Sequence, residues 1–407
     1  MTKMPNTKPL TMSPKVSFED TSIAFSSKSN LQLKKIYLIF ASMNQNWLVK
    51  LGTFFIKLFL FLHFPIKKLI KMTVFEQFCG GENLQECNKT IDNLDKAHIG
   101  TILDYSVEGE DDEKSFDKTA KEVLLTIEKA NQNQAIPFAV FKVTGIGSAE
   151  LLEKVQNQGE LYDEEKEAFE LIRKRIDMLC GRAAVLNVRV FIDGEESWIQ
   201  DIIDELTYEM MEKYNHEKCV VYNTFQMYRK DMFHNLKNAA FEARKQNYYL
   251  GVKLVRGAYM ERERQKAHED NYCEPVHETK EGTDADFNAA MEYTVENREV
   301  ISVCVGTHNE YSCKRLVELM TQHHVQPTDT HFYFAQLLGM SDNISFNLSK
   351  AGYNVAKYVP YGPVDAVMPY LFRRAEENTS VAGQVSREFG LVKREIVRRK
   401  RLEFQKK

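Results

Sequence analysis

The chain has 407 residues, of which 43% are hydrophobic, so it suits one large or two ordinary folded domains and excludes a disordered protein. The formal net charge of −4 conceals basic ends: residues 1–72 hold eleven lysines against Glu19 and Asp20, and residues 393–407 hold eight basic against two acidic side chains. The seven cysteines are scattered without metal-ligand spacing, which argues against a disulfide framework or structural zinc and favours a reducing compartment.

The N-terminal region divides into a flexible polar tail, residues 1–17, and a basic, amphipathic helical arm, residues 18–95. Lysines at 50 and 57 and a proline at 65 interrupt the apolar stretch NWLVKLGTFFIKLFLFLHFPIKKLIKM, so we do not expect a transmembrane span. Basic charge among apolar side chains favours peripheral contact with anionic lipid over nucleic acid. Packing of an amphipathic helix on the protein's own body explains the pattern equally well.

The arm is followed by eight apolar segments rich in β-branched residues, with helical periodicity between them, as in residues 118–130, 166–180 and 231–246. This alternation predicts an α/β fold, a (βα)8 TIM-like barrel over residues 96–407 with a basic C-terminal tail. A doubly wound open sheet is the alternative, but the GxGxxG motif typical of it is absent. The predicted strands are 101–107, 137–144, 185–193, 219–226, 250–259, 301–309, 330–338 and 354–362.

Catalytic side chains of such barrels lie at the C-terminal ends of the strands. Several of the residues at the ends of the predicted strands are cations or hydrogen-bond formers, which suits an anionic substrate or a phosphate-bearing cofactor. Lys142 could instead form a Schiff base with a carbonyl substrate, and the sequence leaves this open. The residues that end or follow the eight strands are Glu108, Lys142, Asp193, Gln226, Arg256 with Tyr259, Thr307 with His308, Gln336 and Tyr358.

A metal site is not expected. His308, His323, His324 and His331 are close in sequence, but a strand end, a loop pair and a strand start need not converge.

The last predicted strand leads into YVPYGPVDAVMPYLFRRAEEN, residues 358–378. Pro363 predicts a helix start, and in that helix Tyr370, Arg373, Arg374 and Glu377 share one face at i, i+3, i+4 and i+7. Because the helix follows strand eight, this face can overhang the barrel mouth. The alternative is a solvated pair between Arg373 and Glu377, which would stabilise the helix by only ~0.3–0.5 kcal/mol.

Six short motifs stand out along the chain: FCGGE (78–82), ILDYSVEGE (102–110), KLVRGAY (253–259), GTHN (306–309), KYVPYGPV (357–364) and PYLFRRAEEN (369–378). Together they resemble the proline dehydrogenase family, in particular the stand-alone type of mitochondria and some bacteria. The similarity runs from about Phe18 to about residue 400. It implies a distorted (βα)8 barrel that holds FAD at its C-terminal mouth, with hydride transfer from C5 of L-proline to flavin N5, giving Δ1-pyrroline-5-carboxylate, and transfer of electrons to a membrane quinone.

The resemblance also implies roles for individual residues. Arg373, Arg374 and Lys142 would bind the proline carboxylate, and Glu108 would help to close the site. The rest of the substrate pocket would comprise Asp193, Leu254, Tyr259, Tyr358 and Tyr370, and the FAD contacts would be Gln226, Lys253, Val255, Gly257, Thr307, His308 and Glu377. Lys253 replaces the arginine common in the bifunctional bacterial enzymes, which leaves its contact with the flavin open.

Three alternatives follow. Related hydroxyproline dehydrogenases have a smaller serine where this chain has Tyr358, so Tyr358 favours proline, although this tyrosine could simply pack. A non-catalytic membrane-bound barrel would keep the fold without the activity.

The first arginine is Arg173, unlike the Arg-rich pattern of a transit peptide, which favours a bacterial cytoplasmic protein at the inner face of the membrane. The mitochondrial matrix or inner membrane is expected for a eukaryotic source.

Overall fold

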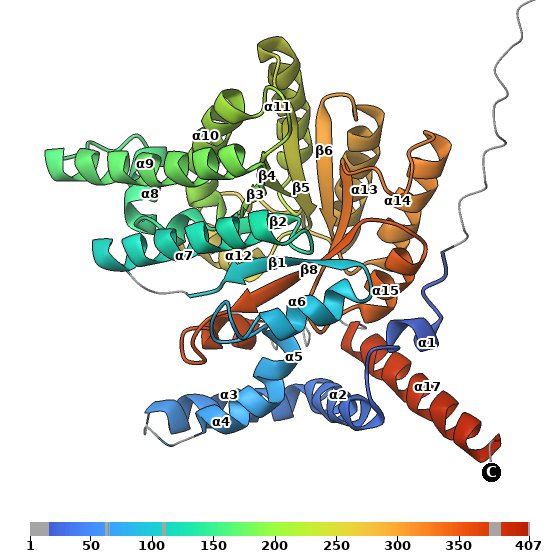
Figure 1. The fold of residues 1–407 in the computed structure, drawn as a ribbon. Coiled ribbons are helices and arrows are strands. Elements are labelled where there is room, and N and C mark those ends of the chain that lie inside the picture. Colours follow the sequence, from blue (N-terminus) through green and yellow to red (C-terminus); the bar gives the residue numbers. More distant parts are fainter. Residues whose placement is uncertain (1–15, 62–63, 65, 108–110, 374–383, 406–407) are drawn as a thin grey trace, which may run out of the picture.

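The computed structural model describes residues 16–61, 64, 66–107, 111–373 and 384–405 (Figure 1). Its centre is a closed barrel of eight parallel strands paired in sequence order, which confirms the predicted α/β barrel. The strands are β1 (Ile99–Tyr105), β2 (Phe138–Phe141), β3 (Arg189–Ile192), β4 (Val221–Gln226), β5 (Leu250–Val255), β6 (Ile301–Gly306), β7 (Phe332–Leu337) and β8 (Val355–Tyr361).

The strands separate two apolar clusters. Because successive side chains of a strand point to opposite faces, one set fills the barrel and the other meets the surrounding helices. Inside the barrel, Phe138 stacks on Phe191 with ring centroids 4.3 Å apart, and Tyr222 meets both rings edge-on at 5.5 Å. These large rings close the interior below the mouth, so that polar chemistry is confined to the C-terminal ends of the strands.

The three segments predicted to be helical, residues 118–130, 166–180 and 231–246, are confirmed as parts of α7, α9 and α11. Only the third differs, because α11 begins one residue later than the predicted segment. The predicted strand 185–193 begins too early, because α9 continues to Leu186 and ends on Asn187, whose left-handed φ of 53° caps the helix. The outer helices are α7 (Glu113–Gln132), α8 (Ala149–Gln156), α9 (Asp163–Leu186), α10 (Ser197–Tyr214), α11 (Met232–Gln246), α12 (Met260–Glu269), α13 (Lys280–Glu296), α14 (Glu310–Gln322) and α15 (Asp342–Lys350).

The N-terminal arm and the basic C-terminal segment form a second helical layer, drawn beneath the barrel in Figure 1. The C-terminal segment is the helix α17 (Gln384–Gln405), and α2 packs against both α17 and α3. Tyr37 of α2 lies with its ring centroid 4.8 Å from that of Phe389. The arm comprises α1 (Thr21–Ala24), α2 (Asn30–Met43), α3 (Asn46–Phe61), α4 (Lys67–Ile70), the π-helical turn η1 (Lys71–Phe75), α5 (Glu76–Phe78) and α6 (Asn88–Asp95).

Hydrogen bonds place this layer at the C-terminal end of the barrel strands. The Gly80 amide donates to the Pro360 carbonyl at 2.8 Å, and the Gly362 amide donates to the Gly81 carbonyl at 3.2 Å. The arm therefore borders the barrel mouth beside β8. Within the described part of the chain, no helix combines the length and hydropathy needed to cross a bilayer.

The helix after β8 begins later than predicted. The Pro363 carbonyl accepts from the amides of Ala366 and Val367, so residues 363–367 form a turn, and helical residues begin at Met368. Val367 is fully buried in the apolar cluster of the arm, and this contact fixes where the turn ends. The helix start predicted at Pro363 was therefore wrong by about one helical turn, because the helix begins at Met368.

Candidate active site

The centre of the barrel mouth is a group of three hydrogen-bonded side chains. Lys253 of β5 forms an ion pair with Asp193, which directly follows β3, and donates to the Tyr358 hydroxyl of β8 at 3.0 Å. That hydroxyl donates in turn to Asp193 Oδ1 at 2.7 Å. Burial, reinforced by the Asp193 and Asp104 carboxylates, raises the pKa of Tyr358 well above its ordinary value, so the phenol remains a donor. Three sites expected from different strands are thus brought together.

Lys142 directly follows β2 and is held by a short turn. The next residues, Val143–Gly145, form a 3₁₀ turn whose last amide donates to the Lys142 carbonyl at 3.2 Å. Glu195 accepts from the Thr144 amide at 3.0 Å and from the Thr144 hydroxyl, which fixes this turn to the loop after β3. Burial raises the pKa of Glu195 to about 7, and the nearby Lys142 cation opposes the shift. Glu195 was not predicted from the sequence.

Tyr259 lies in the electrostatic field of the predicted substrate-binding cations. Burial raises the pKa of Tyr259 to about 12; Lys142 and Arg373 lower it, and Glu195 raises it. Because such effects fade with distance, both Lys142 and Arg373 lie close enough to Tyr259 to influence its pKa. Tyr370, one turn before Arg373, is buried among the apolar residues of the arm.

Three predicted site residues, Arg374, Glu377 and Glu108, lie outside the described residues. Their expected roles therefore stay predictions.

Like Glu195, the carboxylate of Asp104 on β1 lies at the mouth and was not predicted from the sequence. It is buried and accepts from the Ser106 hydroxyl at 2.6 Å. Burial raises the pKa of Asp104, while Lys142 and Lys253 lower it. An acidic residue inside an apolar strand segment was the available signal, because strand interiors seldom bury an unpaired carboxylate.

The predicted FAD contacts line the neighbouring strand ends, β4 to β6. Gln226 Nε2 donates to the Glu195 carbonyl at 2.6 Å, and the Thr307 hydroxyl accepts from Arg256 at 2.8 Å. His308 Nδ1 lies 2.9 Å from Ser341 Oγ. Gly257 has a φ of 128°, and a Cβ there would lie 2.3 Å from the Tyr228 ring, so only glycine fits this turn.

The two remaining β5 residues differ in placement. Leu254 is fully buried in the cluster between strands and helices and does not join the charged group. Val255 ends the strand, and its carbonyl accepts from the Met227 amide at 2.9 Å.

The histidines considered for a metal site make separate contacts, since His331 Nδ1 lies 2.7 Å from Asp329 while His308 faces Ser341. In residues 16–61, 64, 66–107, 111–373 and 384–405 there is no group of three side chains suited to a metal ion.

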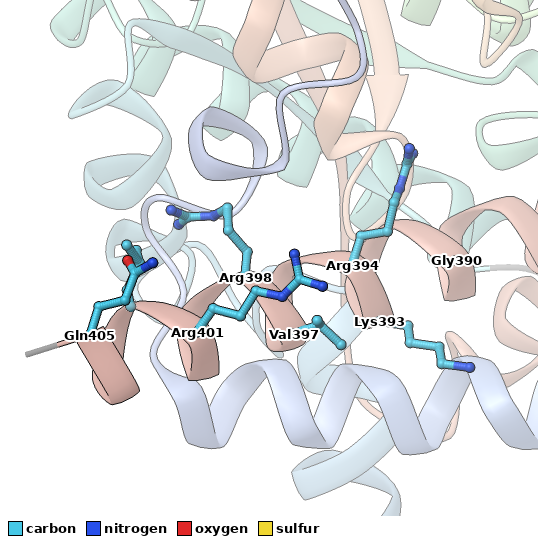
Figure 2. A pocket seen from close by; sticks show the side chains of 8 residues that line it. Gly390, Lys393, Arg394, Val397, Arg398, Arg401 and Gln405 are labelled. Atoms are coloured by element: carbon cyan, nitrogen blue, oxygen red, sulfur yellow. The ribbon is translucent and has the colours of Figure 1, made fainter. Parts of the chain in front are cut away.

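A separate groove of about 520 Å³ runs along α17 and is shown in Figure 2. Arg394 is paired with Glu19 at 2.7 Å, and Arg398 with Glu395 at 2.7 Å, whereas Lys393 and Arg401 are basic side chains with no ion pair among the described residues. This groove is open and basic and lies away from the strand ends. All eight lining residues belong to α17, so the groove contains none of the predicted site residues.

A closed parallel barrel with a buried lysine, carboxylates and a phenol converging at the C-terminal mouth is the architecture of a barrel enzyme. The family model described as proline dehydrogenase matches residues 87–387, which is most of the chain. The protein therefore belongs to the proline dehydrogenase family.

Individual relatives agree with this assignment. Mitochondrial proline dehydrogenase 1 of Dictyostelium discoideum is 33% identical over 93% of this chain and 74% of its own length. The carbapenem antibiotics biosynthesis protein CarD of Pectobacterium carotovorum is 35% identical over 79% of this chain and 83% of its own length. Human mitochondrial proline dehydrogenase 1 is 41% identical over 58% of this chain, which spans only 40% of that relative.

Among solved structures, proline utilization A (PutA) from Bdellovibrio bacteriovorus, inactivated by N-propargylglycine, matches with a TM-score of 0.71 and 20% identity. The match covers 89% of this chain and 38% of the other. At this identity the likeness supports the barrel fold alone.

Proposed function

We propose that the protein oxidises L-proline to Δ1-pyrroline-5-carboxylate with FAD and passes the electrons to a membrane quinone, the first step of proline degradation to glutamate. The observation that carries the proposal is the group of Asp193, Lys253 and Tyr358 at the barrel mouth, together with Lys142 and Arg373, which both influence the pKa of Tyr259. Because the chain belongs to the proline dehydrogenase family, we assign proline as the substrate that these residues bind.

The cations at the mouth suit an amino-acid carboxylate. Arg373 presents a planar guanidinium that can bind a carboxylate through two hydrogen bonds, and Arg374 is the next residue in the sequence. Lys142, which follows β2, adds a third positive charge. We propose that these three side chains hold the proline carboxylate, while Tyr259, Tyr358 and Tyr370 enclose the ring.

The strand ends from β4 to β6 offer a donor set that fits FAD. Lys253 supplies a cation, Thr307 and His308 supply polar groups at one loop, and Gly257 leaves its backbone without a side chain at the mouth. When bound, FAD supplies the hydride acceptor. The residues of the chain bind proline, orient its ring and neutralise its carboxylate.

Tyr358 favours proline over hydroxyproline in this arrangement. Its hydroxyl is fixed between Asp193 at 2.7 Å and Lys253 at 3.0 Å, so the ring cannot swing aside without losing both bonds. A 4-hydroxyl on the substrate would need the space that this ring occupies.

The proposal is tested by proline-dependent reduction of an electron-accepting dye. We expect activity with the wild type and a raised KM for proline in Arg373→Lys, because lysine keeps the charge but loses the planar fork. FAD content should be unchanged in this variant. Activity of Arg373→Met at the wild-type level would contradict the assignment.

A Schiff-base reaction at Lys142 remains the second candidate, because the side chain lies at a strand end beside buried carboxylates. Borohydride treatment in the presence of substrate would trap an adduct on Lys142 and favour this reaction. Flavin-dependent turnover without such an adduct would exclude it.

We also propose that the arm contacts an anionic membrane, where a quinone would be available. Exposed apolar side chains cluster on α3 and α4, including Trp47 (62% exposed), Phe54 (60%) and Leu69 (64%). Lys68 adds an exposed positive charge, and the groove of α17 offers further basic side chains (Figure 2).

Vesicle co-sedimentation tests this contact. Replacing both Trp47 and Phe54 with serine should weaken binding to vesicles that contain phosphatidylglycerol, whereas Val185→Ser, at an even more exposed apolar site on α9 (78%), should leave it unchanged. Equal binding of the wild type and the double variant would contradict the proposal.

A further inference from the structure

The loop between β7 and α15, residues 338–341, joins the barrel to both ends of the chain. Gln77 of the arm donates to the Gly339 carbonyl at 2.9 Å. Gly339 has a φ of 76°, and a Cβ there would lie 2.2 Å from the Gln77 carbonyl oxygen, so the arm sits directly on this loop. From the opposite direction, Glu388 of α17 accepts from the Ser341 amide at 2.6 Å.

Ser341 links Glu388 to the predicted FAD site. Its backbone is left-handed, with a φ of 51°, a conformation that disfavours a side chain and persists only when its surroundings hold it. The Ser341 amide is bound by Glu388, and the Ser341 hydroxyl lies 2.9 Å from His308 Nδ1. Ser341 therefore contacts both α17, through Glu388, and the His308 imidazole that follows β6.

Glu388 is well placed to hold this conformation because it is only 5% exposed and has few alternative partners. Three charged groups lie near it: Asp342, at the start of α15, Lys357, which lies outward on β8, and the adjacent Arg387. Burial and Asp342 raise the pKa of Glu388 to about 7, and the Ser341 amide and Lys357 oppose this shift. The Glu388 carboxyl thus contacts Ser341 through both the backbone amide and the side-chain hydroxyl.

We propose that Glu388 is a positioning residue for the cofactor site: by binding the Ser341 amide it fixes the hydroxyl that contacts His308, and so couples docking of α17 to retention of FAD. The inference rests on the proposed function, since it takes His308 as an FAD contact. It concerns binding of the cofactor and not the chemistry of proline oxidation.

The test is the rate of FAD release from the holoenzyme, followed as the gain of flavin fluorescence after dilution. Because Glu388→Ala leaves the buried Ser341 amide without its acceptor, this variant should release FAD roughly tenfold faster than the wild type. Glu388→Gln, which keeps an acceptor oxygen, should lie between the wild type and Glu388→Ala. Glu403→Gln, an exposed site on the same helix, should match the wild type.

A double-variant cycle separates positioning from general loosening. If Glu388 acts through His308, Glu388→Ala should add little to the release rate of His308→Ala. Ser341→Ala removes the hydroxyl but keeps the amide bound to Glu388, and it should reproduce the effect if Glu388→Ala does not fold. Wild-type release rates in both Glu388→Ala and Ser341→Ala, or fully additive effects with His308→Ala, would overturn the inference. A wild type that binds no FAD would instead overturn the proposed function on which it rests.

Discussion

Two buried lysines on the barrel wall, Lys253 and Lys357, make the same kind of contact on opposite faces. Lys253 points into the barrel, 5.6 Å from the Phe191 ring, and pairs with Asp193. Lys357 lies between the inward-facing residues 356 and 358 and points outward, where its ammonium is 2.9 Å from Asp342.

The difference lies in what else each lysine touches. Lys357 is fully buried and also donates to the carbonyls of Leu337 and Met340, so its donors are used within the loop that follows β7. Lys253 meets only side chains, Asp193 and Tyr358, at the strand ends. We therefore expect Lys357, which donates to backbone carbonyls, to stabilise the loop after β7. Lys253, which contacts side chains at the barrel mouth, is placed to interact with a ligand.

The largest effect on stability is expected at the outward lysine. Lys357→Met leaves the Asp342 carboxylate and two carbonyls without a buried donor, and breaking a buried ion pair in this way typically costs about 3–5 kcal/mol. Urea denaturation measures the loss. Lys350→Met, at an exposed position on α15, should change the free energy of unfolding by less than about 0.5 kcal/mol. Equal values for the two variants would show that Lys357 does not hold this loop.

The inward lysine should instead affect catalysis most. Lys253→Met removes a cation aimed at the site, and we expect kcat/KM for proline to fall roughly 10²–10³-fold, as when one preorganised electrostatic contact is lost. The free energy of unfolding should fall less than in Lys357→Met, because Tyr358 still donates to Asp193. A variant that keeps its activity and loses mainly stability would make the two lysines equivalent.

Two glutamates beside buried lysines have a raised pKa: Glu388, near Lys357 on the outside, and Glu195, near Lys142 at the mouth. The pKa of Glu195 rises from 4.5 to about 7 on folding, so the native state binds its proton more tightly. This contribution to stability is complete below pH 4.5 and is lost as pH rises through about 7, a change of up to roughly 3 kcal/mol.

Glu195→Gln should remove this dependence while keeping an acceptor for the Thr144 amide. Urea midpoints at pH 5 and pH 7.5 provide the measurement: the wild type should lose more stability between these values than the variant does. Parallel profiles would show that Glu195 does not carry a raised pKa.

The smallest effect is expected for Tyr358→Phe, which removes one hydroxyl shared by Lys253 and Asp193. A net loss of about 1 kcal/mol, or roughly fivefold in kcat/KM, corresponds to a single hydrogen bond between such groups. Tyr358→Ser should in addition improve activity with hydroxyproline relative to proline. No change in that ratio would mean that Tyr358 only packs.

Much of the barrel could be predicted because its strands are long apolar runs separated by periodic helices. The strand ends that were placed wrongly have local causes. Val185 and Leu186 look like strand residues but lie in α9, which Asn187 ends in a left-handed conformation. The turn at Pro363 delays the following helix because Val367 must first reach the apolar cluster of the arm.

The candidate site was predicted only in part. Strand ends identified Lys142, Asp193 and Tyr358, because parallel strands bring their C-terminal ends to one mouth. Asp104 and Glu195 were missed, since their importance depends on burial beside cations contributed by other strands. Glu388 lies far along the chain from His308, and only the packing of α17 against the loop after β7 brings the two together.

The most direct test of the account is anaerobic titration of the purified holoenzyme with L-proline and with hydroxyproline, followed at the absorption bands of the flavin. The account predicts a yellow protein whose bands bleach with proline and respond far less to hydroxyproline. A protein that takes up no FAD, or whose flavin stays oxidised in excess proline, would contradict it.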